Sequence, residues 1–203
     1  MKMHYDRINI SSEPFSISKI RSLLNTYIRR AHESYQGDFL ACDPFARNSF
    51  TLKETNFITN DMNPEFETDH NLEFQDFAKL METLDKRFHL VFFDPPYNLT
   101  LLKKHYDGIG KDLKRWQTHS MWGKGKDILA RQVVHGGIVI SFGYNTKGFG
   151  AKRGFEKLAI HNFECHARED QYNLLVVVEQ KLQFTLDDVL DEVKVNPEHP
   201  SRD

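Results

Sequence analysis

The chain has 203 residues, 39% of them hydrophobic and 28% charged, which is ordinary for a globular protein with one domain and a sizeable core. The formal net charge of −2 excludes a uniformly basic nucleic-acid-binding protein, so any polyanion must bind where positive charge is locally concentrated. The two cysteines and ten histidines show no metal-ligand spacing, and we expect neither a metal site nor a disulfide framework.

Residues 1–15 are polar and are expected to form a loop. The segment 16–31 is a predicted helix, because its apolar residues recur at the spacing of one helical face. A short strand is predicted over 39–42, and the run Asp43-Pro44-Phe45-Ala46-Arg47-Asn48 follows it. Within that run Asn48 tolerates a positive φ better than most residues.

The next strand is predicted over 57–59 and is followed by Asn60-Asp61-Met62. A carboxylate after the second strand, about 20 residues past the first loop, is placed to accept hydrogen bonds from ribose hydroxyls. Asp61 has that spacing, although a lone aspartate at a strand end can also serve as a turn or capping residue. The segment 68–77 then mixes acidic and apolar residues, and a helix is predicted over 77–84.

The strongest strand signal is the unbroken apolar run 90–93, which is typical of a strand buried on both faces. Pro95 and Pro96 end it because they lack N–H donors. Asp94 and Tyr97 are therefore expected at the carboxyl end of a core strand, where open α/β sheets bind ligands. Asp94 and a neighbouring carbonyl can accept both hydrogens of a planar amino group, and Tyr97 can lie flat on the attached heterocycle. A strand followed by a proline-rich turn is the alternative.

The segment 98–131 combines positive charge, aromatic rings and glycines, and a second basic loop follows a strand predicted over 138–143. Basic side chains contact phosphates, aromatic rings stack on bases, and glycines indicate mobile loops. We therefore expect 98–131 to form a lid that faces a nucleic acid, the alternative being a solvated surface with tryptophans in the core. The predicted nucleic-acid contacts are Lys103, Lys104, Lys111, Lys114, Arg115, Trp116, Trp122, Lys124, Lys126, Lys147, Lys152 and Arg153.

Two more strands are predicted over 155–165 and 172–181. The alternation of strand, helix and acidic strand end indicates an α/β fold, with residues 1–182 as a single domain and 183–203 as an acidic helix and tail. The chain shows no signal peptide and no apolar run of about 18 residues, so we expect a cytoplasmic protein without membrane contact.

The motif Asp94-Pro95-Pro96-Tyr97 resembles that of the S-adenosylmethionine-dependent adenine-N6 amino-methyltransferases, above all the small phage-type enzymes. The loop at Asp43 is similar to their D-P-F-x-G-x-G motif but has other residues in place of the glycines. The resemblance covers roughly residues 16–182. It implies a Rossmann-like class I methyltransferase sheet with five parallel strands, a C-terminal antiparallel pair and helices on both faces. A phage-encoded protein of this kind would work in the host cytoplasm.

The resemblance also implies that the catalytic motif methylates the exocyclic N6 amine of adenine, in duplex DNA, with S-adenosyl-L-methionine as the cofactor. Glu73 or Asp76, with Phe77, would hold the adenine of the cofactor. The implied cofactor-binding residues are Asp43, Pro44, Phe45, Ala46, Asn48, Asp61, Met62, Glu73, Asp76 and Phe77. Two alternatives stay open: methylation of RNA at adenine N6 or guanine N2, and a non-catalytic protein of this fold that binds the cofactor or nucleic acid, which the missing glycines favour.

Overall fold

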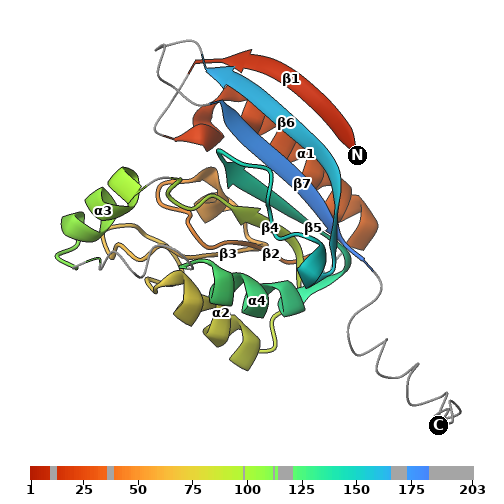
Figure 1. Cartoon of the computed structure of the whole chain (residues 1–203). Coiled ribbons are helices and arrows are strands. Elements are labelled where there is room, and N and C mark those ends of the chain that lie inside the picture. Colours follow the sequence, from red (N-terminus) through yellow and green to blue (C-terminus); the bar gives the residue numbers. More distant parts are fainter. Residues whose placement is uncertain are drawn as a thin grey trace, which may run out of the picture.

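The computed structural model describes residues 1–9, 13–35, 39–97, 99–111, 113, 121–165 and 173–182. A seven-stranded sheet has the order β1-β6-β7-β5-β4-β2-β3 (Figure 1). Its strands are β1 (Lys2–Ile8), β2 (Ala41–Asp43), β3 (Phe57–Thr59), β4 (Phe88–Phe93), β5 (Val133–Gly143), β6 (Phe155–Cys165) and β7 (Leu174–Lys181). The described helices are α1 (Ser18–Tyr35), α2 (Phe74–Thr83), α3 (Leu99–Gly108) and α4 (Gly123–Gln132), with short 3-10 turns at Pro14–Ser16, Phe50–Lys53 and Ala151–Arg153.

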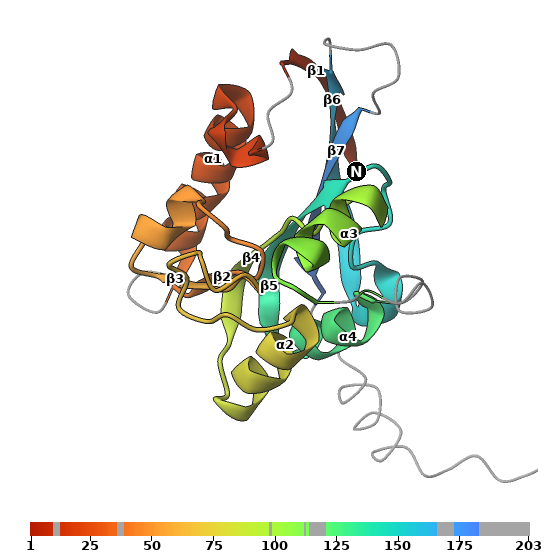
Figure 2. The same ribbon diagram turned by 90° about the vertical axis from the view of Figure 1, so that its left-hand side faces the viewer.

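The predicted fold class is confirmed, because the sheet is Rossmann-like and carries helices on both faces (Figure 2). Strands β3, β2, β4 and β5 run parallel to one another, β7 runs antiparallel to both β5 and β6, and β1 is parallel to β6. One of the five expected parallel strands is reduced to a single bridge between Asn60 and His70. The predicted tail, 183–203, lies outside the described residues, so the domain boundary stays a prediction.

The expectation of a loop at the N-terminus is wrong, because residues 2–8 form the edge strand β1. Six of its seven residues are exposed and Ile8 alone is buried, so the strand has no alternating apolar pattern that the sequence could reveal. Pairing with β6 holds it in place. The rings of His4 and His161 stack 4.5 Å apart, and Arg7 Nε donates to Glu164 Oε2 at 2.9 Å.

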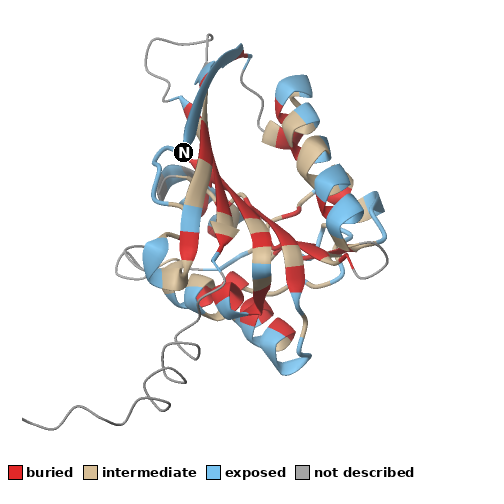
Figure 3. Ribbon diagram, turned by 90° about the vertical axis from the view of Figure 1, so that its right-hand side faces the viewer, coloured by how far each residue is buried: buried red, intermediate tan, exposed pale blue. Residues whose placement is uncertain are grey.

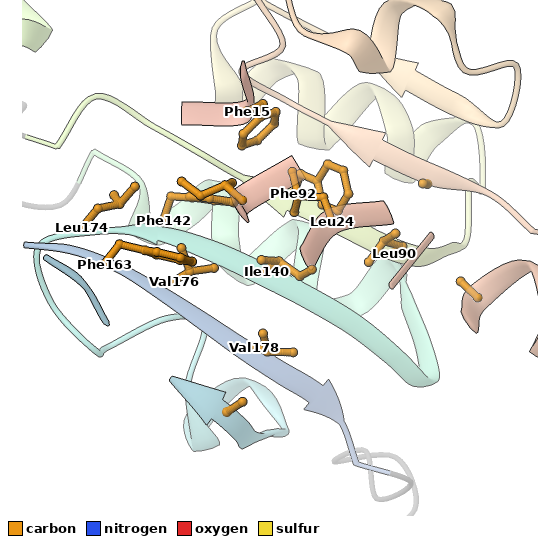
Figure 4. Close-up of a cluster of buried hydrophobic side chains, with 14 of the residues drawn as sticks. Phe15, Leu24, Leu90, Phe92, Ile140, Phe142, Phe163, Leu174, Val176 and Val178 are labelled. Atoms are coloured by element: carbon orange, nitrogen blue, oxygen red, sulfur yellow. The ribbon is translucent and has the colours of Figure 1, made fainter. Parts of the chain in front are cut away.

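Helix α1 covers one face of the sheet and forms the larger apolar cluster with it. Leu24 of α1 and Phe15, which precedes the helix, lie over Phe92 of β4 and Ile140 of β5 (Figure 4). In Figure 3 the buried residues follow the strands and the inner side of α1, and the outer side of α1 is exposed. This packing gives β4 a rigid position, and the catalytic motif predicted from the sequence begins directly after it.

Helices α2 and α4 cover the opposite face, where Phe77 of α2 and Leu129 of α4 belong to a second buried cluster. The expectation that glycines make 98–131 a mobile loop is wrong for 99–108 and for the beginning of α4, which are helical. A helix end was expected over 128–134, and α4 does end there, at Gln132. Gly125 serves close packing instead, because a Cβ there would lie 2.4 Å from the Phe74 ring. Along the described stretches of the chain, no helix has both the length and the apolar character needed to cross a membrane.

Candidate active site

Three aspartates lie at the carboxyl ends of neighbouring strands. Asp43 is the last residue of β2, Asp61 follows β3, and Asp94 follows β4. Because β2 pairs with both β3 and β4, the three loops leave the same edge of the sheet. The charge of Asp94 contributes to raising the pKa of Asp43, as expected for carboxylates that are close together. The chain therefore collects its acidic strand ends in one place, as the sequence predicted.

Asp43 holds the loop after β2 from within. It is 0% exposed. One carboxylate oxygen accepts from Thr51 Oγ1 at 2.8 Å, and the other accepts from the Phe45 N–H at 3.3 Å. Burial raises the pKa of Asp43 to about 7, although the hydrogen bond from Thr51 lowers it. Its hydrogen bonds are thus made to its own loop.

Asn60 joins three segments of the site and was not among the predicted site residues. Its Nδ2 donates to the carbonyls of Pro44 and Leu72, both at 3.0 Å, and its Oδ1 accepts from the Leu72 N–H at 3.0 Å. Only 1% of the residue is exposed, so these bonds satisfy a buried amide. The sequence signal was its place beside Asp61 at the end of a strand.

Asp61 and the turn after β2 face one another. Asp61 is 9% exposed and accepts from the Asn63 N–H at 2.9 Å. Burial raises its pKa, whereas the hydrogen bond from Asn63 and the charge of Arg47 lower it. Asn48 is the residue of this run that best tolerates a positive φ, but the residue that adopts one is Arg47, at 48°. The Ala46 N–H donates to Asn60 O and the Ser49 N–H donates to Ala46 O, and these bonds close the turn around Arg47.

Asp94 and Tyr97 form a pair at the end of β4. The Tyr97 hydroxyl donates to Asp94 Oδ1, and it is the only hydrogen-bond partner of Asp94 in the described part of the chain. Burial raises the pKa of Asp94 to about 7, while the hydrogen bond from Tyr97 and the charge of Arg47 lower it. The second carboxylate oxygen is left to accept a hydrogen bond from a ligand.

The loop after β5 presents another ring to this pair. Tyr144 packs edge-on against Tyr97 with ring centroids 5.1 Å apart. Buried Glu179 holds this loop in place, because its carboxylate accepts hydrogen bonds from the N–H groups of Phe149 and Gly150 at 2.6 and 3.0 Å. Gly148 must be glycine here, since a Cβ would lie 2.0 Å from a Glu179 oxygen. These contacts join residues about 30 positions apart, so the sequence offered no signal for them.

Several predicted cofactor-binding residues are placed in the core or engaged with other side chains. Phe45 packs edge-on against Phe93 and Trp122, with centroids 5.3 and 5.1 Å apart. Phe77 is 0% exposed and has no surface to offer an adenine. Asp76 is exposed and pairs with Lys79 at 2.9 Å on the outside of α2.

Glu73 connects α2 to α3. It accepts from the Tyr106 hydroxyl at 2.6 Å and from Lys111 Nζ at 3.1 Å. Both partners come from the segment that was predicted to face a nucleic acid. Met62 is partly exposed beside Asp61, and Pro44 is buried.

The predicted nucleic-acid contacts divide by what their charged groups touch. Lys126 is directed inward, since its Nζ donates to Gly148 O at 2.8 Å and lies 4.5 Å from the centre of the Phe93 ring. Burial lowers its pKa to about 8. Arg153 binds Asp127 at 2.7 Å and the Phe149 carbonyl at 2.9 Å. These two cations support the protein's own loops.

The other predicted contacts are at the surface or undescribed. Lys103 pairs with Asp107 at 2.9 Å, and Trp122 is partly buried against Phe45 and Phe74. Among the predicted contacts, the exposed lysines without an ion pair in the described part are Lys104, Lys124, Lys147 and Lys152. Lys114, Arg115 and Trp116 lie outside the described residues. Across the described ranges, no cluster of three or more His, Cys, Asp or Glu side chains is arranged to hold a metal ion.

No protein-family model matches the chain, and no curated protein matches its sequence. Among solved structures it is similar to the N-methyltransferase NodS from Bradyrhizobium japonicum WM9, with a TM-score of 0.46 and 10% identity over 86% of this chain and 100% of that chain. It is similar to TrmN from Thermus thermophilus, with a TM-score of 0.46 and 12% identity over 79% of this chain and 48% of that chain. For an rRNA methylase from Streptococcus thermophilus the TM-score is 0.45, with 10% identity over 86% and 99%. Likenesses at these TM-scores and identities assign neither a family nor a reaction to this chain.

Proposed function

We propose that the chain transfers a methyl group from S-adenosyl-L-methionine to the exocyclic N6 amine of adenine in DNA. The observation that carries this proposal is Asp94, a carboxylate at the end of a rigid core strand whose only described partner is the Tyr97 hydroxyl. Its second oxygen and the adjacent Pro95 carbonyl can accept the two hydrogens of one planar amine, and the proline pair keeps both acceptors in place.

These acceptors address the difficulty of the reaction. The lone pair of an adenine amine is delocalised into the ring, which makes the nitrogen a poor nucleophile. Hydrogen bonds to Asp94 and to the Pro95 carbonyl draw the lone pair back to the nitrogen. The cofactor supplies a methyl group on a positively charged sulfur. As the N–C bond forms and the S–C bond breaks, the nitrogen carries an extra proton, and Asp94, with its pKa raised to about 7, can accept it.

The residues around Asp94 fit such a cofactor. The Asp61 carboxylate, at the end of β3, can accept from ribose hydroxyls. The Nε of Arg47 is buried and has no hydrogen-bond partner in the part of the chain that the structure describes, so the site offers an unused donor beside its carboxylates. A ligand that has both hydroxyl donors and a carboxylate acceptor can bind the Asp61 carboxylate and the Arg47 N–H at the same time.

Tyr97 is proposed to stack on the target base, which must leave the duplex because its amine cannot be reached inside the helix. Tyr144 lies edge-on to Tyr97 and would form a second wall beside that base. The exposed lysines Lys104, Lys124, Lys147 and Lys152 are the side chains we assign to phosphate contacts.

The test is methyl transfer from labelled S-adenosylmethionine to unmethylated duplex DNA, with the modified nucleoside identified by mass spectrometry. We expect N6-methyladenine that disappears in Asp94→Ala while cofactor binding, measured by calorimetry, is retained. Asp6→Ala is the matched control, because Asp6 lies on β1 and makes an exposed ion pair with Lys19. If methyl groups are transferred to RNA but not to DNA, the proposed substrate is RNA instead of DNA. Cofactor binding without transfer to any nucleic acid would favour a non-catalytic protein.

A further inference from the structure

Arg47 occupies a backbone position that suits glycine. It lies in the turn after β2 with φ at 48°, in the left-handed region that side chains with a Cβ rarely adopt. Only one other non-glycine residue in the described part, Asp85, has a positive φ. An arginine held in this conformation directs attention to what its side chain does.

The side chain of Arg47 has an unused hydrogen-bond donor. Its Nε is buried and has no hydrogen-bond partner among the described residues, and its guanidinium carbon lies 5.6 Å from the centre of the Phe66 ring. No ion pair to Arg47 exists among the residues that the structure describes. A buried N–H without an acceptor is costly and uncommon in native proteins, so an acceptor from outside the chain is expected.

The charges around Arg47 locate that acceptor. Its positive charge lowers the pKa of both Asp61 and Asp94, and also that of His105 on α3. Arg47 therefore lies near both the carboxylate assigned to the ribose and the carboxylate assigned to the target amine. In the described part of the chain neither carboxylate forms an ion pair with the Arg47 side chain, and the hydrogen bond that Asp61 receives from Arg47 comes from its backbone. The planar fork of the guanidinium is therefore available.

We infer that Arg47 binds the carboxylate of the methionine arm of the cofactor, an assignment that rests on the proposed function. The sulfur of S-adenosylmethionine carries the ribose, the methyl group and this arm. With the ribose at Asp61 and the methyl group facing Asp94, the arm starts in the region that Arg47 faces. The edge formed by Nε and one terminal nitrogen matches a carboxylate with two parallel hydrogen bonds.

Charge balance supports the same partner. A guanidinium beside a positively charged sulfur is repelled unless an anion lies close to it. The carboxylate of the arm is part of the same ligand and supplies that anion. Arg47 thus replaces glycine in a loop that resembles a cofactor-binding motif and adds a direct contact that a glycine cannot make.

The experiment compares two ligands that differ in this arm. S-adenosylhomocysteine contains the amino-acid carboxylate, whereas 5′-methylthioadenosine keeps the adenosine and the sulfur and lacks the arm. Their affinities are measured by calorimetry for the wild-type chain, Arg47→Gly and Arg47→Lys. We expect Arg47→Gly to bind S-adenosylhomocysteine at least tenfold more weakly and 5′-methylthioadenosine within about twofold of wild type. Arg47→Lys keeps the charge but loses the fork, so its loss should be selective and smaller.

Asp85→Gly is the matched control, because it relieves the same φ of 48° at an exposed residue outside the site and should change neither affinity. Equal weakening of both ligands in Arg47→Gly would overturn the inference, since Arg47 would then only shape the loop. The inference would also be overturned if Arg47→Gly bound both ligands as the wild type does but bound a DNA oligonucleotide more weakly. If Arg47→Gly does not fold, the selectivity of Arg47→Lys decides. A wild-type chain that binds neither ligand would overturn the proposed function as well, and is thereby distinguished from failure of the Arg47 assignment alone.

Discussion

The loops after β2 and β4 each begin with an aspartate whose pKa burial raises to about 7, yet the two carboxylates have different surroundings. Asp43 is 0% exposed and its two oxygens accept from Thr51 and Phe45 of its own loop. Asp94 is partly exposed, and Tyr97 is its only partner in the described part of the chain. A raised pKa therefore does not by itself identify the reactive group. In the proposed function it is the unused hydrogen-bonding capacity of Asp94 that assigns the reactive role to it, and Asp43 serves as the internal support of the neighbouring loop.

The largest expected effect comes from removing the Asp94 carboxylate. Asp94→Asn should lower the rate of methyl transfer by about a thousandfold, because the amine loses a charged acceptor and a proton acceptor. Its melting temperature should stay close to that of the wild type, because few bonds in the described structure depend on Asp94. Single-turnover assays and thermal unfolding on the same samples measure the two quantities. A variant that loses stability and activity together would contradict the division of roles.

Removing Asp43, the support of the loop after β2, should lower stability and leave the activity of the folded protein intact. Asp43→Ala leaves the Thr51 hydroxyl and the Phe45 N–H without their acceptor, and we expect it to lower the free energy of unfolding by about 2–3 kcal/mol. Urea unfolding measures the loss. The fraction that remains folded should still transfer methyl groups, since Asp94 is intact. Full stability in this variant would show that the loop after β2 does not depend on Asp43.

The pH dependence of stability separates the two aspartates further. For each of them the native pKa of about 7 lies above the usual aspartate pKa of 3.8, so the native state binds more protons between these values. Stability must therefore fall as the pH rises from about 4 to 7 and then become level. Asp94→Asn removes one of the two groups, so its loss of stability between pH 5 and pH 8 should be smaller by on the order of 1–2 kcal/mol. An identical loss in both proteins would mean that the pKa of Asp94 is not raised.

The sequence predicted the parts of this arrangement that rest on local patterns. The unbroken apolar run of β4 and the two prolines after it located Asp94 and Tyr97, and the strand spacing located Asp61. The edge strand β1 was missed because its exposed residues have no apolar period. The beginning of helix α4 was missed because its glycines were interpreted as loop residues, whereas Gly125 allows a close approach to Phe74.

The contacts that shape the site could not be predicted because they join distant parts of the chain. Asn60 binds the Leu72 backbone 12 residues away, and Glu179 holds Phe149 from 30 residues away. Burial of side chains also depended on packing, which placed Phe77 in the core and directed Lys126 inward. Residue type and spacing carry no information about either.

The smallest expected effects come from the hydroxyl that serves each aspartate. Thr51→Val removes the donor to Asp43 and should cost about 1 kcal/mol of stability without changing the rate of the folded fraction.

Tyr97→Phe keeps the ring for stacking but removes the donor to Asp94. Because that hydrogen bond lowers the pKa of Asp94, its loss should move the acidic limb of the pH–rate profile to higher pH. Thr51→Val should leave this limb in place, since Thr51 acts on Asp43. If Thr51→Val moved the acidic limb as far as Tyr97→Phe does, Asp43 and Asp94 would titrate as one coupled pair. The distinction between Asp43 as a support and Asp94 as the reactive group would then fail.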